Sequence, residues 1–236
     1  MTAADPPAVS PGAAGTLYDT RRGAYYAKPA MRGWLHLLWF AASLVAGPLL
    51  VASGHGAARV TALAVYAASV TGLFGTSALY HRGTWAAAWS QRLQRLDHTM
   101  IFFLIAGTAT PAFLITGHGA FGWVCLIVLW TLTIAAAALH LVWMHAPELL
   151  MGVTFIALGL VGGLALPAVW LDAGLAPGVL MLAGGVLYIG GAVSYHLRWD
   201  PVPAVFGYHE VFHACVCAAA TCQYVSIALF IARVAG

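Results

Sequence analysis

The residues with the most chemical content form the short sequence His209-Glu210-Val211-Phe212-His213. If this segment is helical, the two imidazoles stand one turn apart on one helix face, where both nitrogens can reach the same tetrahedral zinc ion. Two unpaired imidazoles in a membrane helix are costly unless they face an ion or a water-filled cavity. The spacing therefore favours metal ligation over packing, which is the alternative interpretation of the pair.

A second pair with the same spacing is Ser77 and His81, in the sequence SALYH. On a helix the hydroxyl and the imidazole share one face, so His81 would supply a third nitrogen to the same metal. The alternative is structural: Ser77 bonds a backbone carbonyl one turn back, and His81 extends to the membrane interface. Lone histidines near the same end of the chain's helices, such as His36, are expected to be structural.

A third candidate is Asp97, which we expect to open a helix whose apolar part begins at Met100. A carboxylate at a helix start can be only an N-cap, which is the alternative here. Three histidines with an open fourth position are nevertheless typical of a catalytic zinc site, in which the metal acidifies its water and a nearby carboxylate takes the proton. We therefore predict zinc as the cofactor, with Asp97 close to it.

The elements that must position these residues are seven long apolar stretches. Each is long enough to cross a hydrocarbon core of about 30 Å as a helix, and the runs are continuously apolar, unlike the alternating strands of a membrane β-barrel. We predict an all-α polytopic membrane protein, a bundle of seven transmembrane helices. The stretches run approximately over Leu37 to Ala52, Val60 to Tyr80, Met100 to Ile115, Phe121 to Val142, Leu149 to Trp170, Gly178 to Leu197 and Tyr208 to Ile231.

The composition agrees with a membrane protein and excludes other classes. Of the 236 residues, 62% are hydrophobic and only 7% are charged, whereas soluble domains carry about 25% charged residues. A net charge of +3 is too small for a nucleic-acid-binding surface. We expect membrane lipids as partners and no nucleic acid, and the sequence indicates no protein partner.

The distribution of basic residues predicts the orientation. Eight of the ten lysines and arginines lie before the first span, between the second and third spans, or between the sixth and seventh, whereas Arg59 and Arg233 lie on the opposite side. By the positive-inside rule, the amino terminus is cytoplasmic and the carboxyl terminus is outside, as expected of a protein in a plasma membrane. Residues 1–33, rich in proline, glycine and alanine, are expected to form a disordered cytoplasmic tail, and residues 34–236 the transmembrane domain.

The motifs resemble those of the hemolysin III family, bacterial members of the progestin and adipoQ receptor group. That group belongs to a wider superfamily of seven-helix membrane hydrolases that includes alkaline ceramidases. The resemblance extends from about Lys28 to the end of the chain, and its motifs occur in family order: KPAMRGWLH at 28–36, SALYH at 77–81, LDHTMIFFLIAGTATP at 96–111 and HEVFH at 209–213.

The resemblance implies a cytoplasmic amino terminus and a zinc ion held by His81, His209 and His213. It further implies that Asp97 holds a zinc-bound water and that Ser77 lies close to the metal, where it polarises a carbonyl group or orients the water. Asp97 and Ser77 are thus the expected catalytic residues.

The sequence is compatible with three functions. The leading hypothesis is a zinc-dependent hydrolase of an amide or ester in a lipid-like substrate at the inner leaflet. The second is a non-enzymatic, zinc-stabilised receptor-like protein or regulator of membrane homeostasis. The third takes HEVFH as the HExxH motif of an intramembrane protease, with Glu210 as the base.

Overall fold

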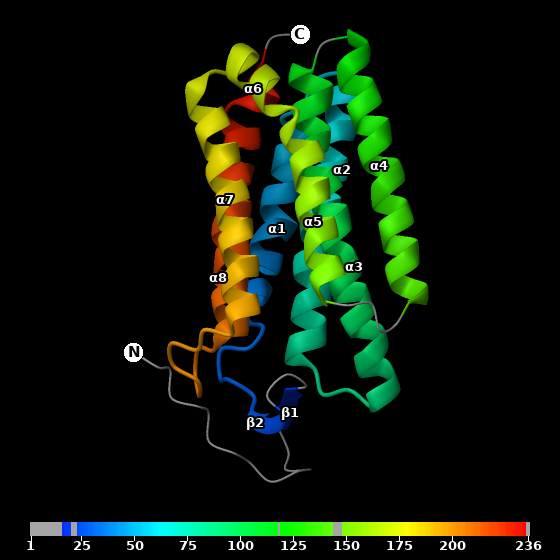
Figure 1. Cartoon of the computed structure of the whole chain (residues 1–236). Helices are drawn as coiled ribbons and strands as arrows, with labels where there is room; N and C mark the ends of the chain where they lie inside the picture. Colours follow the sequence, from blue (N-terminus) through cyan, green and yellow to red (C-terminus); the bar gives the residue numbers. More distant parts are fainter. Residues whose placement is uncertain (1–15, 20–22, 118, 144–147, 235–236) are drawn as a thin grey trace.

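The computed structural model describes residues 16–19, 23–117, 119–143 and 148–234. Their helices stand side by side in one bundle, and a short β-hairpin lies at one end (Figure 1). The strands are β1 (Thr16–Asp19) and β2 (Ala24–Ala27), and the helical elements are α1 (Trp34–Ala52), α2 (Ala57–Arg82), α3 (Ala87–Pro111), the π-helical turn η1 (Ala112–Thr116), α4 (Gly119–Val142), α5 (Glu148–Gly163), α6 (Leu166–Asp172), α7 (Leu175–Leu197), α8 (Tyr208–Leu229) and the 3₁₀ turn η2 (Ile231–Arg233).

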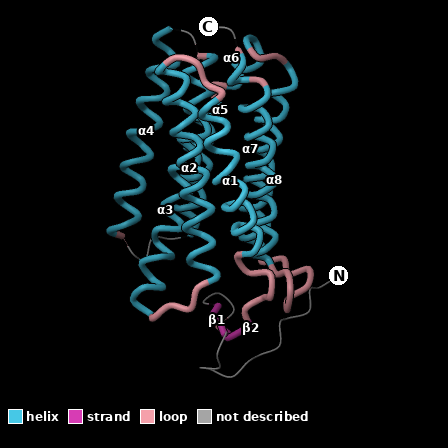
Figure 2. Tube along the Cα trace, turned by 180° about the vertical axis from the view of Figure 1, so that it is seen from behind, coloured by secondary structure: helices cyan, strands magenta, loops and turns pink. Residues whose placement is uncertain are grey.

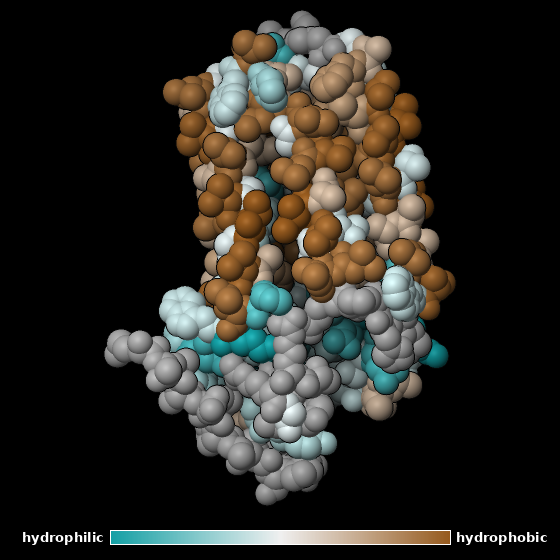
Figure 3. All heavy atoms as spheres, in the orientation of Figure 1, coloured by the Kyte–Doolittle hydropathy of each residue, from teal (hydrophilic) through white to brown (hydrophobic). Residues whose placement is uncertain are grey.

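Seven helical segments within the described residues are long and apolar enough to cross a membrane, which confirms the predicted number. Helices form here because each satisfies its own backbone hydrogen bonds where lipid offers none. The face of the bundle seen in Figure 3 is apolar along most of its length, whereas hydrophilic residues gather at the end that carries the hairpin. The protein is therefore an all-α integral membrane bundle.

The middle of the bundle is formed by α2 and α3. In the most apolar stretch of each span, two thirds of the residues are buried in α3 and half are buried in α2. Only 11% are buried in the span that contains α5. Large side chains fill the space around these two helices, among them Phe74, Phe102 and Phe113. The views from both sides show α4 at one edge of the bundle and α7 beside α8 (Figure 2).

Two helices differ from the lengths that hydropathy predicts. α3 begins at Ala87 rather than near Met100, because polar residues that favour a helix extend it beyond the apolar run. Hydropathy detects only the segment that suits hydrocarbon. The fifth span is interrupted after Gly163, and Pro167 occupies the first turn of α6, where a proline is tolerated because its missing N–H is not needed.

The segment before α1 differs in part from the expected disordered tail. Residues 16–19 and 24–27 pair as an antiparallel hairpin, with Leu17 opposite Tyr26 and Tyr18 opposite Tyr25. The strands contain Tyr18, Tyr25 and Tyr26, and aromatic residues favour strands. Residues 1–15 and 20–22 lie outside the described residues.

Close packing of the central helices depends on Gly107 of α3. A Cβ atom at this position would lie 2.6 Å from the Cβ of Ser69 on α2, so only glycine allows this approach. We expect Gly107→Ala to destabilise the bundle by about 1–3 kcal/mol through overpacking, measured as a lower thermal midpoint of the purified protein in detergent. Gly185→Ala in α7 is the matched control, because a Cβ there meets nothing within 4 Å. Equal midpoints for the two variants would contradict this account of the packing.

Candidate metal centre

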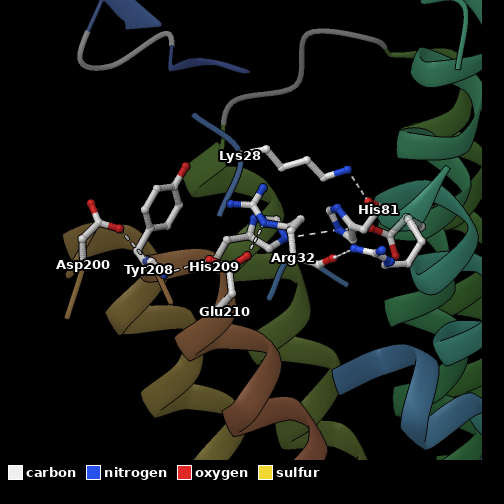
Figure 4. Close-up of polar contacts among 10 residues, drawn as sticks. Lys28, Arg32, His81, Asp200, Tyr208, His209 and Glu210 are labelled. Carbon is white, nitrogen blue, oxygen red and sulfur yellow. Dashed lines mark hydrogen bonds and ion pairs between the residues drawn. The ribbon is translucent and has the colours of Figure 1, made fainter. Parts of the chain in front are cut away.

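Three histidines from two distant helices, α2 and α8, converge at the hairpin end of the bundle. His81 lies in the last turn of α2, and His209 and His213 lie in the first two turns of α8. One ligand atom from each of the three lies within 4.8 Å of the other two. The Nε2 atoms of His81 and His209 are 3.2 Å apart, and the dashed line between them in Figure 4 marks this contact.

This geometry suits zinc. Two nitrogens bound at ordinary Zn–N distances with tetrahedral angles are about 3.3 Å apart, close to the distance between the two Nε2 atoms. His81 and His213 are buried and His209 is partly buried. Neutral imidazoles in a water-poor site keep their lone pairs available to a metal. The donor set therefore fits a zinc ion, with three nitrogens and a position left for a fourth ligand.

Asp97 joins the cluster from α3. Its Oδ2 atom lies 3.4 Å from Nε2 of His81, and its side chain is buried. The N-cap alternative is wrong, because α3 begins at Ala87 and Asp97 is well inside it. A buried carboxylate beside the His81 imidazole has a physical reason to stay there, since a dication bound by the histidines would offset its charge.

Ser77 lies one turn before His81 on α2, and both side chains are buried. Burial of His81 excludes the alternative in which its ring extends to the interface. Among the described residues, no hydrogen bond joins the Ser77 hydroxyl to the carbonyl one turn back. The structure thus places the hydroxyl on the helix face of His81, at the same end of the bundle as His209 and His213.

His36 is a member of this group that sequence reasoning assigned to a structural role. Its ring stacks on that of His213, with 3.7 Å between centroids and 7° between planes. It is buried, and neither ring nitrogen has a hydrogen-bond partner within the described part of the chain. The sequence could have indicated this contact, because His36 lies in the first turn of a span, at the same end as the other histidines.

Glu210 has a role that the HExxH interpretation does not provide. One carboxylate oxygen pairs with the guanidinium of Arg32, and the other accepts the backbone N–H of Gly207 at 2.9 Å (Figure 4). Both side chains are buried, at 4% exposed for Arg32 and 1% for Glu210. The carboxylate is therefore engaged in capping α8 and in an ion pair, which argues against its use as a catalytic base.

Basic residues surround this pair, at the level of the hairpin. Burial lowers the pKa of Lys28, and the guanidinium groups of Arg32 and Arg82 lower it further. Burial also opposes the charge on Arg32, but the carboxylate of Glu210 outweighs it, and the pKa of Arg32 is raised. Arg32 thus stays fully charged and needs its buried partner.

The family profile described as Haemolysin-III related matches residues 24–224, a range that contains all four motifs with their histidines, Asp97 and Ser77. The chain belongs to the haemolysin III family. Hemolysin-3 of Bacillus cereus is 29% identical over 188 residues, which cover 78% of this chain and 81% of the relative. The Hemolysin-3 homolog of Bacillus subtilis (strain 168) is 24% identical over 187 residues, covering 79% and 85%. The expected haemolysin III membership is confirmed over most of the bundle.

Metal binding by this haemolysin III family protein is testable with the purified chain. We expect about one zinc ion per chain in the wild type, and loss of zinc in His81→Ala and in the double variant His209→Ala, His213→Ala, because each change removes nitrogens from the cluster. Elemental analysis in detergent measures this. His140→Ala is the control, since His140 lies on α4 outside the cluster. Zinc that survives both ligand changes would contradict the assignment.

Proposed function

We propose that this protein is a zinc-dependent hydrolase that cleaves an amide or ester bond in a lipid-like substrate. The observation that carries the proposal is the convergence of three histidines with a buried carboxylate inside a bundle whose outer faces are apolar. A site of this composition, reached through lipid, suits a substrate that partitions into the membrane.

In this proposal His81, His209 and His213 hold the zinc through neutral imidazole nitrogens. When bound, zinc acts as a Lewis acid and makes water a nucleophile near neutral pH. Asp97 accepts the proton of the attacking water and returns it to the leaving group, as a carboxylate beside the reacting atoms can do. The Ser77 hydroxyl donates a hydrogen bond to the carbonyl oxygen of the substrate, where negative charge develops.

The position of the histidines supports a substrate at one leaflet. His81 is in the last turn of a span and His209 in the first turn of another, so the reacting bond lies near one membrane surface. A lipid-like molecule would place its polar linkage at this level and its apolar part among the helices.

A second candidate is a non-enzymatic role, in which zinc stabilises a receptor-like protein or a regulator of membrane homeostasis. The supporting observation is that the ligands come from α2 and α8, which are 128 residues apart between His81 and His209. A metal between them would fix the relative position of the two helices. An intramembrane protease is not proposed, because Glu210 is paired with Arg32.

The proposed location is a bacterial plasma membrane, with the hairpin end in the cytoplasm and the histidines at the inner leaflet. Support comes from the basic residues, whose side chains favour the cytoplasmic surface. Arg59 and Arg233 are at the other end. The described basic residues at the hairpin end are Lys28, Arg32, Arg82, Arg92, Arg95 and Arg198, whereas Arg21 and Arg22 lie outside the described residues.

Asp97→Asn separates catalysis from metal binding. The amide keeps the shape of the side chain but cannot take a proton, so we expect zinc to be retained and hydrolysis to fall by about 10²–10⁴-fold. Mass spectrometry of lipid extracts from cells that express each form measures the change in cleaved products. Asp172→Asn, in α6 at the opposite end, is the control. Identical lipid profiles for wild type, Asp97→Asn and cells without the protein would favour the non-enzymatic role.

The orientation is tested by reporter fusions. Alkaline phosphatase fused after Gly236 is expected to be active, and green fluorescent protein at the same site to be dark, because seven crossings carry that end outside. Fusions in the loop at 83–86, between α2 and α3, should give the reverse pattern. A fluorescent carboxyl-terminal fusion would overturn the proposed orientation.

A further inference from the structure

The helices that carry the metal ligands have few contacts with each other. α2 packs mainly on α1 and α3, whereas α8 packs mainly on α7. α1 packs on α2 and also contacts α8, and the segment before α1 connects the end of α2 to the start of α8, so both influence the distance between His81 and the histidines of α8. Residues 28–33, which we call the strap, make that connection.

The strap contacts the end of α2 at three points. The ammonium group of Lys28 donates a hydrogen bond to the backbone carbonyl of His81, and the guanidinium of Arg82 donates one to the carbonyl of Arg32 at 3.4 Å. Gly33 has a φ of +80° and lies directly against His81, where a Cβ atom would be 2.7 Å from the histidine's own Cβ. Only glycine fits this conformation and this contact without strain.

The strap also holds the start of α8 and the loop before it. The backbone N–H groups of Ala30 and Met31 donate to the carbonyls of Ala204 and Val205, both at 3.1 Å. Arg32 pairs with Glu210, which lies between His209 and His213 in the chain. Figure 4 shows Arg32 beside Glu210 of the first turn of α8.

We propose that Arg32 is a positioning residue of the metal centre, whose pairing with Glu210 sets the separation between His81 and the two histidines of α8. This inference rests on the proposed binding of zinc. Arg32 does not touch the metal, and it acts through the strap on one side and through α8 on the other. The pair spans 178 residues of sequence and is buried at both ends, so a break leaves one charge without its partner.

A matched control exists at the opposite end of the same two helices. Arg59, at the start of α2, donates to the carbonyls of Ala232 at 3.2 Å and Val234 at 2.6 Å, just beyond α8. Arg59→Gln therefore loosens the contact between the same two helices at the end away from the strap. The comparison distinguishes a general loss of stability from a specific effect on the site.

The experiment measures the Kd for Zn²⁺ by chelator competition, together with the thermal midpoint, for the full chain in detergent. We expect Arg32→Gln to raise the Kd by about 10- to 100-fold, as loss of residues that orient metal ligands does. Arg32→Lys keeps the charge but not the planar group, and an intermediate Kd is expected. Arg59→Gln should lower the midpoint and leave the Kd at the wild-type value.

A double variant, Arg32→Met with Glu210→Leu, covers the case in which Arg32→Gln does not fold. Removal of both charges avoids an unpaired buried ion, so this variant should fold but bind Zn²⁺ more weakly than the wild type. A wild-type Kd in either Arg32→Gln or the double variant would overturn the positioning role. Absence of zinc binding by the wild type itself would instead reject the proposed metal centre, and the positioning role with it.

Discussion

Charged and polar groups buried in a membrane bundle must find their partners within the protein, because lipid offers none. This constraint organises the hairpin end of the molecule. Glu210 sits in the first turn of α8 and is matched by Arg32 from outside the spans. Asp97 sits inside α3 and is matched by His81 of α2. The first pair joins elements 178 residues apart and the second joins two consecutive helices, so satisfying charge also fixes which helix ends meet.

The bundle contains two tightly packed groups of helices, and the histidines lie at the boundary between them. α2 packs on both α1 and α3 in one group, and α7 packs along α8 in the other, with a smaller contact between α1 and α8. His81 and Asp97 belong to the first group and His209 and His213 to the second. A site at such a boundary is sensitive to small relative shifts of the two groups. This sensitivity is compatible with either proposed role, catalysis or regulation of membrane homeostasis.

The sequence predicts the spans well because hydrocarbon imposes one requirement, a long apolar helix, that composition reveals directly. It predicts the histidine cluster because helical spacing and a shared membrane level restrict which side chains can meet. It does not predict where α3 starts, since a polar helix outside lipid carries no hydropathy signal. Arg32 was missed as a partner of Glu210 because only the three-dimensional arrangement brings residues 178 positions apart together. The hairpin was missed because its two short strands lie in a segment whose overall composition is typical of disorder.

The long separation between Arg32 and Glu210 has a consequence for biogenesis. The strap leaves the ribosome before the spans, and α8 follows the other six spans in the chain. Until α8 is inserted, Arg32 has no carboxylate to meet, and the nitrogens of His81 have no neighbours from α8. The histidine cluster is therefore complete only after α8 has been inserted, and a chain that stops before α8 would contain six of these spans but neither the ion pair nor the cluster.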